Sequence, residues 1–438
     1  MPPSPLLSAA ELEPFRQRGV IIPRPDLVAV AKDVSPEALA PGAVLHPFCR
    51  LSGAATRVGP GAVLGEGGAV TLQDVWVGEG ARVGTMGPVA AKTCAMGPGT
   101  VLGSGAVEDA VFLGKEGPQP EITCGLGFRV RKGSLYEEDA SSGQQTDTKM
   151  TVLFPWVTLG SNVNWCDLLM AGGTGPGLGD FSEVGSGAVH FNYSPRGDKA
   201  TGSLLGHVTG VFLRSPRLFL GGNLSLLGPA QAEFGAETGA GNRYAKKLRA
   251  GWNAPQVLPK DRSFDSSLYG NLSWVWQSQL DYLGQLAALM AWYRQVRIPL
   301  AQGRVEQETV YRRGLAVLEL NRAERVHQLA GWAARVEQGL SRLEAGHPQD
   351  PRLPQHRALA LGWPQAAQRL AAPMAEPPAP ADLRLGLETS AGRQTPWRYT
   401  KIIQGLTTGQ AKAGEAWLQS VAQQAVPEDL YRLVPALS

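Results

Sequence analysis

The chain of 438 residues has room for two or three domains, and its 41 Lys and Arg residues nearly balance its 38 Asp and Glu residues. This balance gives no basis for expecting nucleic acid or a membrane surface as a partner, and no apolar run approaches the roughly 18 residues of a membrane span. The first residues lack the pattern of a signal peptide, and the four cysteines are scattered without a CxxC spacing, so we expect a cytoplasmic protein with no metal site and no disulfide framework.

Residues 1–40 are expected to form a short helix and a lead-in to the next region. Ser8 and Glu11 have the spacing of a capping box. In that motif the Ser hydroxyl and the Glu carboxylate accept hydrogen bonds from backbone N–H groups at the start of a helix.

Residues 41–256 carry aliphatic residues at a six-residue interval, and glycine directly follows many of them, as in VGPGAVLGEGGAV and VGEGARVGTMGP. A helix would need apolar residues every three or four positions, and a strand every second position. The six-residue interval instead predicts a left-handed parallel β-helix, a solenoid of triangular coils in which three hexapeptides make one coil. We expect glycines at the corners and aliphatic side chains inside, and the inward set should include Val58, Leu64, Val77, Val83 and Leu102.

The six-residue interval is lost at about residues 115–150. KEGPQPEITCGLGF and YEEDASSGQQTDTKM are polar and have no regular aliphatic positions. We therefore expect a polar excursion from the solenoid there, followed by a return to the coil at VTLGSNV.

Residues 257–346 have apolar residues at helical spacing and predict a long antiparallel helical hairpin. The first helix is expected over 263–297, with Ser263 as its N-cap and Pro299 as its stop, and the second over about 304–344. The hairpin would pack against the solenoid, cover its C-terminal end or mediate assembly.

The helical hairpin contains several tryptophans that allow two interpretations. Trp274, Trp276 and Trp292 could line a ligand groove, but aromatic residues at helical spacing are more commonly part of a core. The remaining residues, 347–438, are expected to form a Pro- and Ala-rich linker or arm up to 382 and a tail with one helix at about 408–424.

The segment HFNYSPRGDKATGSLLG, residues 190–206, is the most polar and charged stretch within the repeat region. A loop that leaves a regular solenoid costs conformational entropy, and such loops commonly carry function. Asn192 offers a donor and acceptors for a sugar amide or hydroxyl, while Arg196 and Lys199 offer cations for a phosphate. Arg196 could equally pair with Asp198 inside the loop.

Residues 157–245 resemble the left-handed β-helix family, most closely the acetyltransferase half of bifunctional UDP-N-acetylglucosamine pyrophosphorylase/glucosamine-1-phosphate N-acetyltransferases. The resemblance rests on the pair Asn192–Tyr193, on Lys199 and Thr201 in the loop that follows, and on the return to an aliphatic–Gly step at Leu205–Gly206. It implies that Asn192 and Tyr193 bind an amino-sugar phosphate and that Lys199 contacts the sugar phosphate or the coenzyme. The hexapeptide resemblance extends over roughly residues 41–250.

The resemblance also implies acetyl-CoA as a loosely bound co-substrate and a homotrimer as the assembly. Arg214 and Arg217 lie within two coils of Lys199 and are expected to bind the coenzyme together with it. The chain departs from the family in one respect. The family's catalytic His lies on the coil before the Asn–Tyr pair, and residues 157–189 contain no His. His190 is therefore the candidate base for acyl transfer.

Two functions remain open from the sequence. The first is an acetyl-CoA-dependent acyltransferase that acts on a sugar phosphate or nucleotide sugar; we expect no pyrophosphorylase domain, since only about 40 residues precede the first repeat. The second is a non-catalytic sugar-nucleotide-binding or scaffold protein that keeps the β-helix without a catalytic base.

Overall fold

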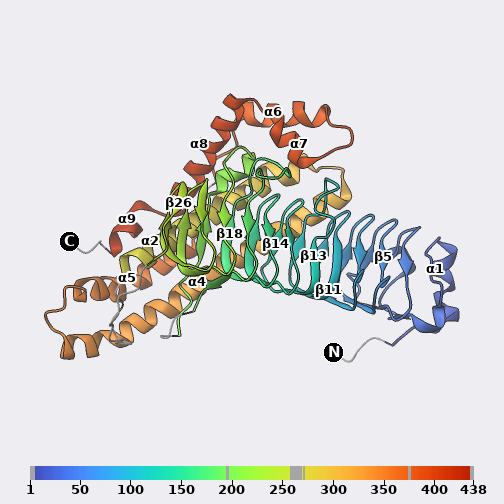
Figure 1. The fold of residues 1–438 in the computed structure, drawn as a ribbon, viewed down its shortest axis with the longest axis horizontal. Helices are drawn as coiled ribbons and strands as arrows, with labels where there is room; N and C mark the ends of the chain where they lie inside the picture. The colour runs from blue at the N-terminus through green and yellow to red at the C-terminus, as the bar shows by residue number, and fades with distance from the viewer. Residues whose placement is uncertain (1–4, 194–196, 257–268, 270–271, 373–375, 435–438) are drawn as a thin grey trace.

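The computed structural model describes residues 5–193, 197–256, 269, 272–372 and 376–434, and its strands form one parallel β-solenoid (Figure 1). The chain turns through three faces in each coil, which we call faces A, B and C in chain order. Each strand pairs in parallel with the strands of the same face in the neighbouring coils. The sequence prediction of a parallel solenoid is thus confirmed.

The strands of each face follow one another along the solenoid, and several longer strands bend from one face to the next. Face A comprises β2 (Val44–Leu45), β5 (Val63–Leu64), β8 (Arg82–Val83), the first residues of β11 (Val101–Glu108) and β13 (Cys124–Val130), β15 (Ser141–Ser142), β17 (Thr158–Leu159), β19 (Glu183–Val184), β22 (Phe219–Leu220), β24 (Ala236–Thr238) and β26 (Gly251–Asn253). Face B comprises β1 (Ala29–Val30), β3 (Arg50–Ser52), β6 (Val70–Gln73), β9 (Val89–Lys92), the last residues of β11 and β13, the first residues of β16 (Asp147–Leu153) and β18 (Asn164–Met170), β20 (Val189–Phe191), and the first residues of β23 (Ser225–Ala232) and β25 (Arg243–Leu248). Face C comprises β4 (Arg57–Val58), β7 (Trp76–Val77), β10 (Ala95–Met96), β12 (Val111–Phe112), β14 (Leu135–Tyr136), β21 (Ser203–Leu205) and the last residues of β16, β18, β23 and β25.

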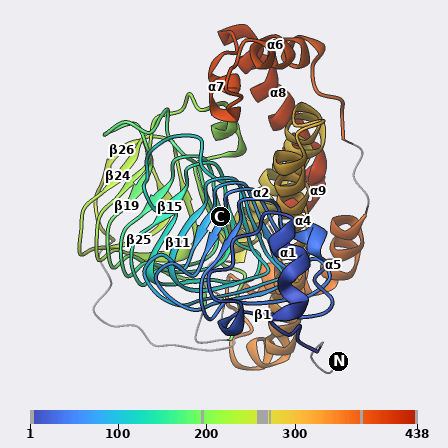
Figure 2. The same cartoon turned by 90° about the vertical axis from the view of Figure 1, so that its right-hand side faces the viewer.

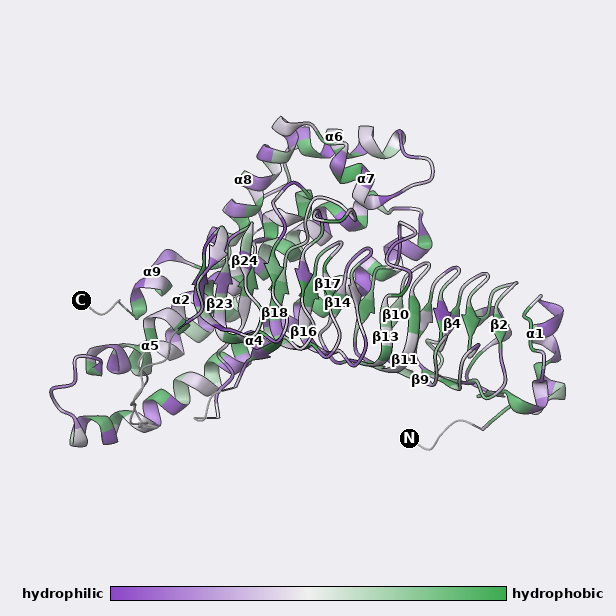
Figure 3. Cartoon of the chain, viewed as in Figure 1, coloured by the Kyte–Doolittle hydropathy of each residue, from purple (hydrophilic) through white to green (hydrophobic). Residues whose placement is uncertain are grey.

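The interior of the solenoid is a set of apolar ladders. On face A, Leu45 pairs with Leu64, Leu64 with Val83, and Val83 with Leu102, so one coil here is one residue longer than three hexapeptides. The five aliphatic residues predicted to point inward are all buried. Figure 3 shows the same hydrophobic segments returning in coil after coil. Stacking of this kind buries one continuous core that no single coil could form.

The corner between faces B and C has an unusual backbone conformation. A residue with positive φ turns the chain there in successive coils, at Asp74, Thr93, Asp109, Gly133, Met150 and Asp167, and five of these six are not glycine. Non-glycine residues avoid this left-handed region, although Asp tolerates it better than most. The corner therefore forms a ridge of tightly turned residues along the solenoid.

The polar excursion is shorter than the sequence predicts. The chain leaves the coil after Leu113 and returns at Cys124, and β13 to β16 then occupy most of residues 124–153 as regular strands. The aliphatic pattern disappears there because Cys124, Ser142 and Thr148 take buried positions that aliphatic residues fill elsewhere.

The helical hairpin packs on face C (Figure 2). It consists of α2 (Leu272–Trp292), a π-helical turn (Tyr293–Arg297), α3 (Ile298–Leu300) and α4 (Val305–Gly346). Helix α4 contacts β10, β12 and β14, while α2 contacts β21 and β23. The predicted hairpin is confirmed, although α3 includes Pro299 and ends only at Leu300, and Ser263 lies outside the described residues. Trp276 and Trp292 are core residues, and the indole N–H of Trp274 donates to Pro229 O at 3.1 Å.

The prediction of a linker or arm over 347–382 is wrong, because most of it is a helix, α5 (Leu353–Ala371). Leu359, Ala366 and Leu370 are buried in a cluster with residues of α4, and Leu353 is also buried. The sequence prediction missed this helix because the many Pro and Ala residues made the helical spacing of its buried apolar residues hard to recognise.

The rest of the chain adds helices at its two ends and one short helix between β21 and β22. They are η1 (Ala10–Leu12), α1 (Glu13–Gln17), η2 (Pro25–Leu27), η3 (Pro36–Ala38), η4 (Val208–Phe212), α6 (Ala381–Gly392), α7 (Tyr399–Gln404), α8 (Thr408–Ala425) and α9 (Glu428–Leu433). The capping box is present, since Ser8 N donates to Glu11 Oε2 at 2.7 Å and Glu11 N donates to Ser8 Oγ at 3.3 Å. Helix α8 matches the one helix predicted in the tail.

Candidate functional site

The polar loop is an insertion at the corner between faces B and C. In the preceding coil Asp167 alone makes this corner, with Cys166 on face B and Leu168 on face C. In the next coil the chain leaves face B after Phe191 and re-enters face C at Ser203, where Ser203 pairs with Leu168. Asn192, at the start of this insertion, therefore lies next to Asp167.

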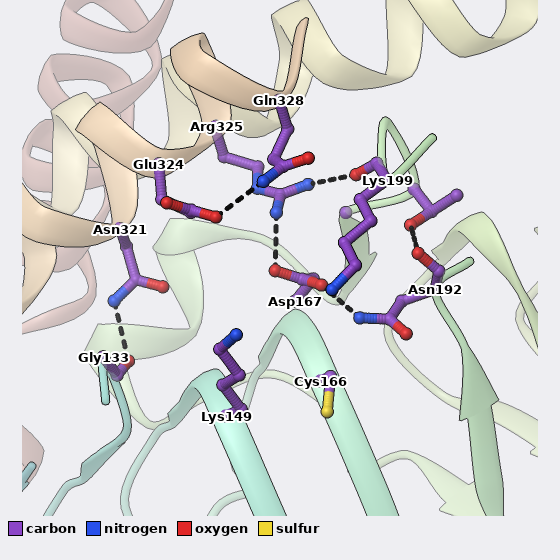
Figure 4. A network of polar contacts seen from close by, with 12 residues as sticks. Gly133, Lys149, Cys166, Asp167, Asn192, Lys199, Asn321, Glu324, Arg325 and Gln328 are labelled. Carbon is purple, nitrogen blue, oxygen red and sulfur yellow. Dashed lines mark hydrogen bonds and ion pairs between the residues drawn. The ribbon is translucent and has the colours of Figure 1, made fainter. Parts of the chain in front are cut away.

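Asp167 is the centre of a network of polar contacts that joins the loop to α4 (Figure 4). Its Oδ1 accepts a hydrogen bond from Arg325 Nη2 at 2.5 Å, and its Oδ2 accepts one from Asn192 Nδ2. Arg325 Nη1 donates to Lys199 O at 3.0 Å, and Thr201 Oγ1 donates to Asn192 O at 2.7 Å. The loop is thus held by a buried ion pair between the solenoid and the hairpin.

Two lysines extend toward this network from different elements. Figure 4 shows Lys149, from β16, and Lys199, from the loop, with both ammonium groups directed toward Asp167. Lys199 Nζ lies 5.9 Å from the ring centroid of Tyr193, which is largely exposed. The labelled side chains of the network thus include three cations, Lys149, Lys199 and Arg325, and two carboxylates, Asp167 and Glu324. This leaves a positive excess of one charge, which suits an anion.

Lys149 also lines a groove on face B with a volume of about 550 Å³. Its other cationic wall residues are Lys92, Arg129, Arg131 and Lys132. Arg131 pairs with Asp147 at 2.6 Å and Lys92 with Glu108 at 3.5 Å. The groove therefore continues the positive charge of the network along the solenoid.

His190 lies inside the solenoid rather than at the surface of the loop. Its Nδ1 is 2.5 Å from Cys166 O, and its Nε2 is 2.8 Å from Ser203 Oγ. Burial lowers the pKa of His190 to about 4, so the ring is neutral at neutral pH. Because both nitrogens are bonded and the ring is buried, the structure does not present His190 to a substrate as the expected base. Alternation along β20 explains this placement, since Phe191 points outward and is half-exposed.

The remaining predicted residues are not all brought together. Arg196 lies outside the described residues, and so does its expected pairing with Asp198; Asp198 is itself buried and accepts a hydrogen bond from Tyr269 Oη at 3.5 Å. Arg214 and Arg217 lie between β21 and β22, at the corner between faces C and A. Arg214 donates to Leu406 O, between α7 and α8, and Arg217 is 3.6 Å from Glu183. The structure therefore separates both arginines from Lys199 by one face of the coil.

Three residues of the network were not predicted from the sequence: Asp167, Lys149 and Arg325. Arg325 had a readable signal, because it is a charged residue within the buried stripe of α4 that includes Leu318 and Leu329. Asn321, one turn earlier, is also buried and donates to Gly133 O at 2.7 Å. Polar residues on the apolar side of a helix need a partner across the interface.

The described residues include no group of three or more His, Cys, Asp or Glu side chains that could hold a metal ion. None of the described helices combines the length and the apolar character of a membrane-spanning segment. Comparison of the sequence with protein-family models gives no match, and no curated protein matches the chain.

Proposed function

We propose that this protein binds a phosphorylated sugar or a nucleotide sugar at the corner between faces B and C, without using His190 as a catalytic base. The observation that carries the proposal is the positive excess around Asp167, where Lys149 and Lys199 extend toward one point. A phosphate monoester would balance these charges and accept charge-assisted hydrogen bonds from both ammonium groups.

Asn192 gives the proposed site its capacity for a sugar. Its Nδ2 donates to Asp167, which fixes the amide plane and leaves Oδ1 as an acceptor for a hydroxyl or amide N–H of the ligand. The side chain of Tyr193 is exposed beside Lys199 and offers a flat surface for a sugar ring or a base. The groove on face B has room for the remainder of a nucleotide sugar.

Binding without acyl transfer is the function that these contacts support best. Acyl transfer to an amine needs a group that accepts a proton from the amine. His190 is buried, and burial raises the pKa of the Cys166 thiol to about 11, which leaves the thiol a poor nucleophile. Acetyl-CoA as a co-substrate therefore belongs to the alternative function and needs its own measurement.

The test is a titration of the full chain with glucosamine 1-phosphate and UDP-N-acetylglucosamine, measured by calorimetry. We expect binding that weakens at least about tenfold in Lys149→Ala and in Lys199→Ala. The melting temperatures of both variants without ligand should stay near that of the wild type, because neither ammonium group has an ion pair in the described structure. Lys412→Ala, at an exposed position of α8, is the matched control and should bind as the wild type does.

Two results would overturn the proposal. The first is that neither phosphorylated probe binds, or that a probe binds equally well to the wild type, to Lys149→Ala and to Lys199→Ala. The second is acetyl transfer from acetyl-CoA to glucosamine 1-phosphate by the wild type that disappears in His190→Ala with the fold intact. That second result would favour the acyltransferase instead.

A further inference from the structure

A second cavity lies between the last coils of the solenoid and the C-terminal helices, away from the loop. Its volume is about 360 Å³, within the range of small-molecule sites. The solenoid contributes walls from the β21, β23 and β25 region, and the other walls come from α2, α8 and α9. Because segments far apart in the sequence form it together, the cavity exists only in the folded chain.

Asp281 of α2 is the fixed acceptor of this cavity. Its Oδ1 accepts a hydrogen bond from Tyr431 Oη at 3.0 Å, and its Oδ2 accepts one from Gln231 Nε2 at 2.8 Å. These partners come from α9 and β23, so three elements determine the orientation of the carboxylate. A carboxylate has about four lone-pair sites, and these two bonds leave acceptor capacity for hydroxyl groups of a ligand.

Donors and amides line the rest of the cavity. Gln285 Oε1 accepts a hydrogen bond from Val208 N at 2.8 Å, which orients the amide and leaves its NH₂ group as a donor. Gln423 of α8 also lines the cavity. His207 packs against the ring of Phe234, with ring centroids 5.5 Å apart, and desolvation lowers the pKa of its imidazole. A neutral imidazole offers one donor and one acceptor.

The charges at this cavity are balanced, unlike those around Asp167. Asp281 and Glu233 supply two carboxylates, and Glu233 is paired with Lys247 at 3.5 Å and with Arg249 at 3.1 Å. No net positive charge remains to hold a phosphate, so the cavity favours an uncharged ligand with many hydroxyls. A fixed carboxylate and fixed amides can bond the equatorial hydroxyls of a sugar, and the flat imidazole ring of His207 can contact its apolar face.

We infer that this cavity binds a neutral saccharide, with Asp281, Gln285 and Gln423 as the hydrogen-bonding residues. The site is distinct from the loop site and goes beyond the proposed function. It would let one chain hold an uncharged glycan and a phosphorylated sugar at the same time.

Saturation-transfer NMR on the full chain tests this inference with glucose, galactose, N-acetylglucosamine, maltose and lactose as probes. We expect at least one of these sugars to receive saturation and its affinity to fall at least about fivefold in Asp281→Ala and in Gln423→Ala. Gln424→Ala is the matched control, since Gln424 is the next residue of α8 and bonds Ser420 instead of lining the cavity. Its sugar binding should equal that of the wild type.

Asp281→Ala could disturb the packing of α2, so Gln423→Ala provides a second and independent test. Gln423 is exposed, so Gln423→Ala should keep the wild-type melting temperature and still lose affinity. The inference is overturned if none of the five sugars receives saturation, or if Gln423→Ala and Gln424→Ala bind the same sugar equally well. Loss of phosphate binding at the loop site would not bear on this result, because the probes here are uncharged.

Discussion

Arg325 of α4 and Asp167 of β18 form a buried ion pair with 2.5 Å between Nη2 and Oδ1, although 158 residues separate them in the chain. The side chains are only 2% and 7% exposed. The same arginine bonds the backbone of the polar loop, so one residue of the hairpin fixes both the corner of one coil and the insertion in the next.

Removing one member of this pair should destabilise the protein strongly. Arg325→Met leaves the Asp167 carboxylate buried without its cation, and we expect a loss of about 3–5 kcal/mol in the free energy of unfolding. Replacing both residues, as Arg325→Met with Asp167→Asn, should recover part of that loss. Denaturant unfolding of the wild type and of both variants measures these losses.

The control for this prediction is an exposed pair of similar length. Arg357 and Glu344 are 2.6 Å apart, and their side chains are 53% and 39% exposed. Arg357→Ala should cost less than about 1 kcal/mol. Equal losses for the buried and the exposed pair would contradict the structural role given to Arg325.

The sequence allowed the fold to be predicted wherever a short period repeats. The aliphatic–Gly interval identified the inward-pointing residues between Val58 and Leu102, and the helical spacing identified α2 and α4. The return to the coil at Cys124 was missed because Ser142 and Thr148 fill buried positions that aliphatic residues take elsewhere, and Thr148 Oγ1 is bonded to Tyr136 Oη at 3.3 Å. Local periodicity carries no information about such substitutions.

The candidate site was only partly predictable, and the reason is the distance between its members in the chain. Asn192 and Lys199 were identified because both lie in one polar stretch. Asp167 and Arg325 belong to it only through the register of β18 and the placement of α4 on face C. His190 was misplaced because in a strand a shift of one residue moves a side chain from the surface to the interior.

The pH dependence of stability should reveal the buried state of His190. Burial lowers its pKa from 6.5 to about 4, so between these values the unfolded chain binds a proton that the folded chain does not. Stability therefore falls as the pH falls from about 6.5 to about 4. His190→Gln has no such proton and should show a weaker decline of the melting temperature over this window. An unchanged decline would mean that the ring is accessible in solution.

A second group of buried residues should give a pH dependence of opposite sign. Glu137 is buried against Arg297, and the partly buried Glu116 accepts hydrogen bonds from Thr400. Desolvation together with the neighbouring Glu138 carboxylate raises the pKa of both glutamates. Above their ordinary value of 4.5 the folded chain keeps protons that the unfolded chain has lost, so stability falls as the pH rises from about 5 to about 8.

The variant Glu116→Gln tests this second dependence. Its uncharged amide removes one of the titrating groups, and the melting temperature should fall less steeply between pH 5 and pH 8 than in the wild type. The exposed carboxyl of Glu66, which pairs with Arg82 at the surface, provides the control. Glu66→Gln should keep the wild-type slope, and a steeper slope in Glu116→Gln would contradict the prediction.

The assembly expected from the family resemblance is a homotrimer, and the corner between faces A and B offers a surface for it. Phe48, Met86 and Leu126 lie along this corner and are 61%, 56% and 43% exposed. Face C is covered by α2 and α4, so contacts between copies would use faces A and B. Packing around a threefold axis would remove these apolar side chains from water.

Light scattering should give three times the 46.5 kDa of one chain for the wild type. The double variant Met86→Glu, Leu126→Glu should give the mass of one chain, because assembly would bury two unpaired charges in every copy. Leu385→Glu, at an equally exposed position of α6, should leave the trimer intact. A wild-type mass of one chain would rule the trimer out.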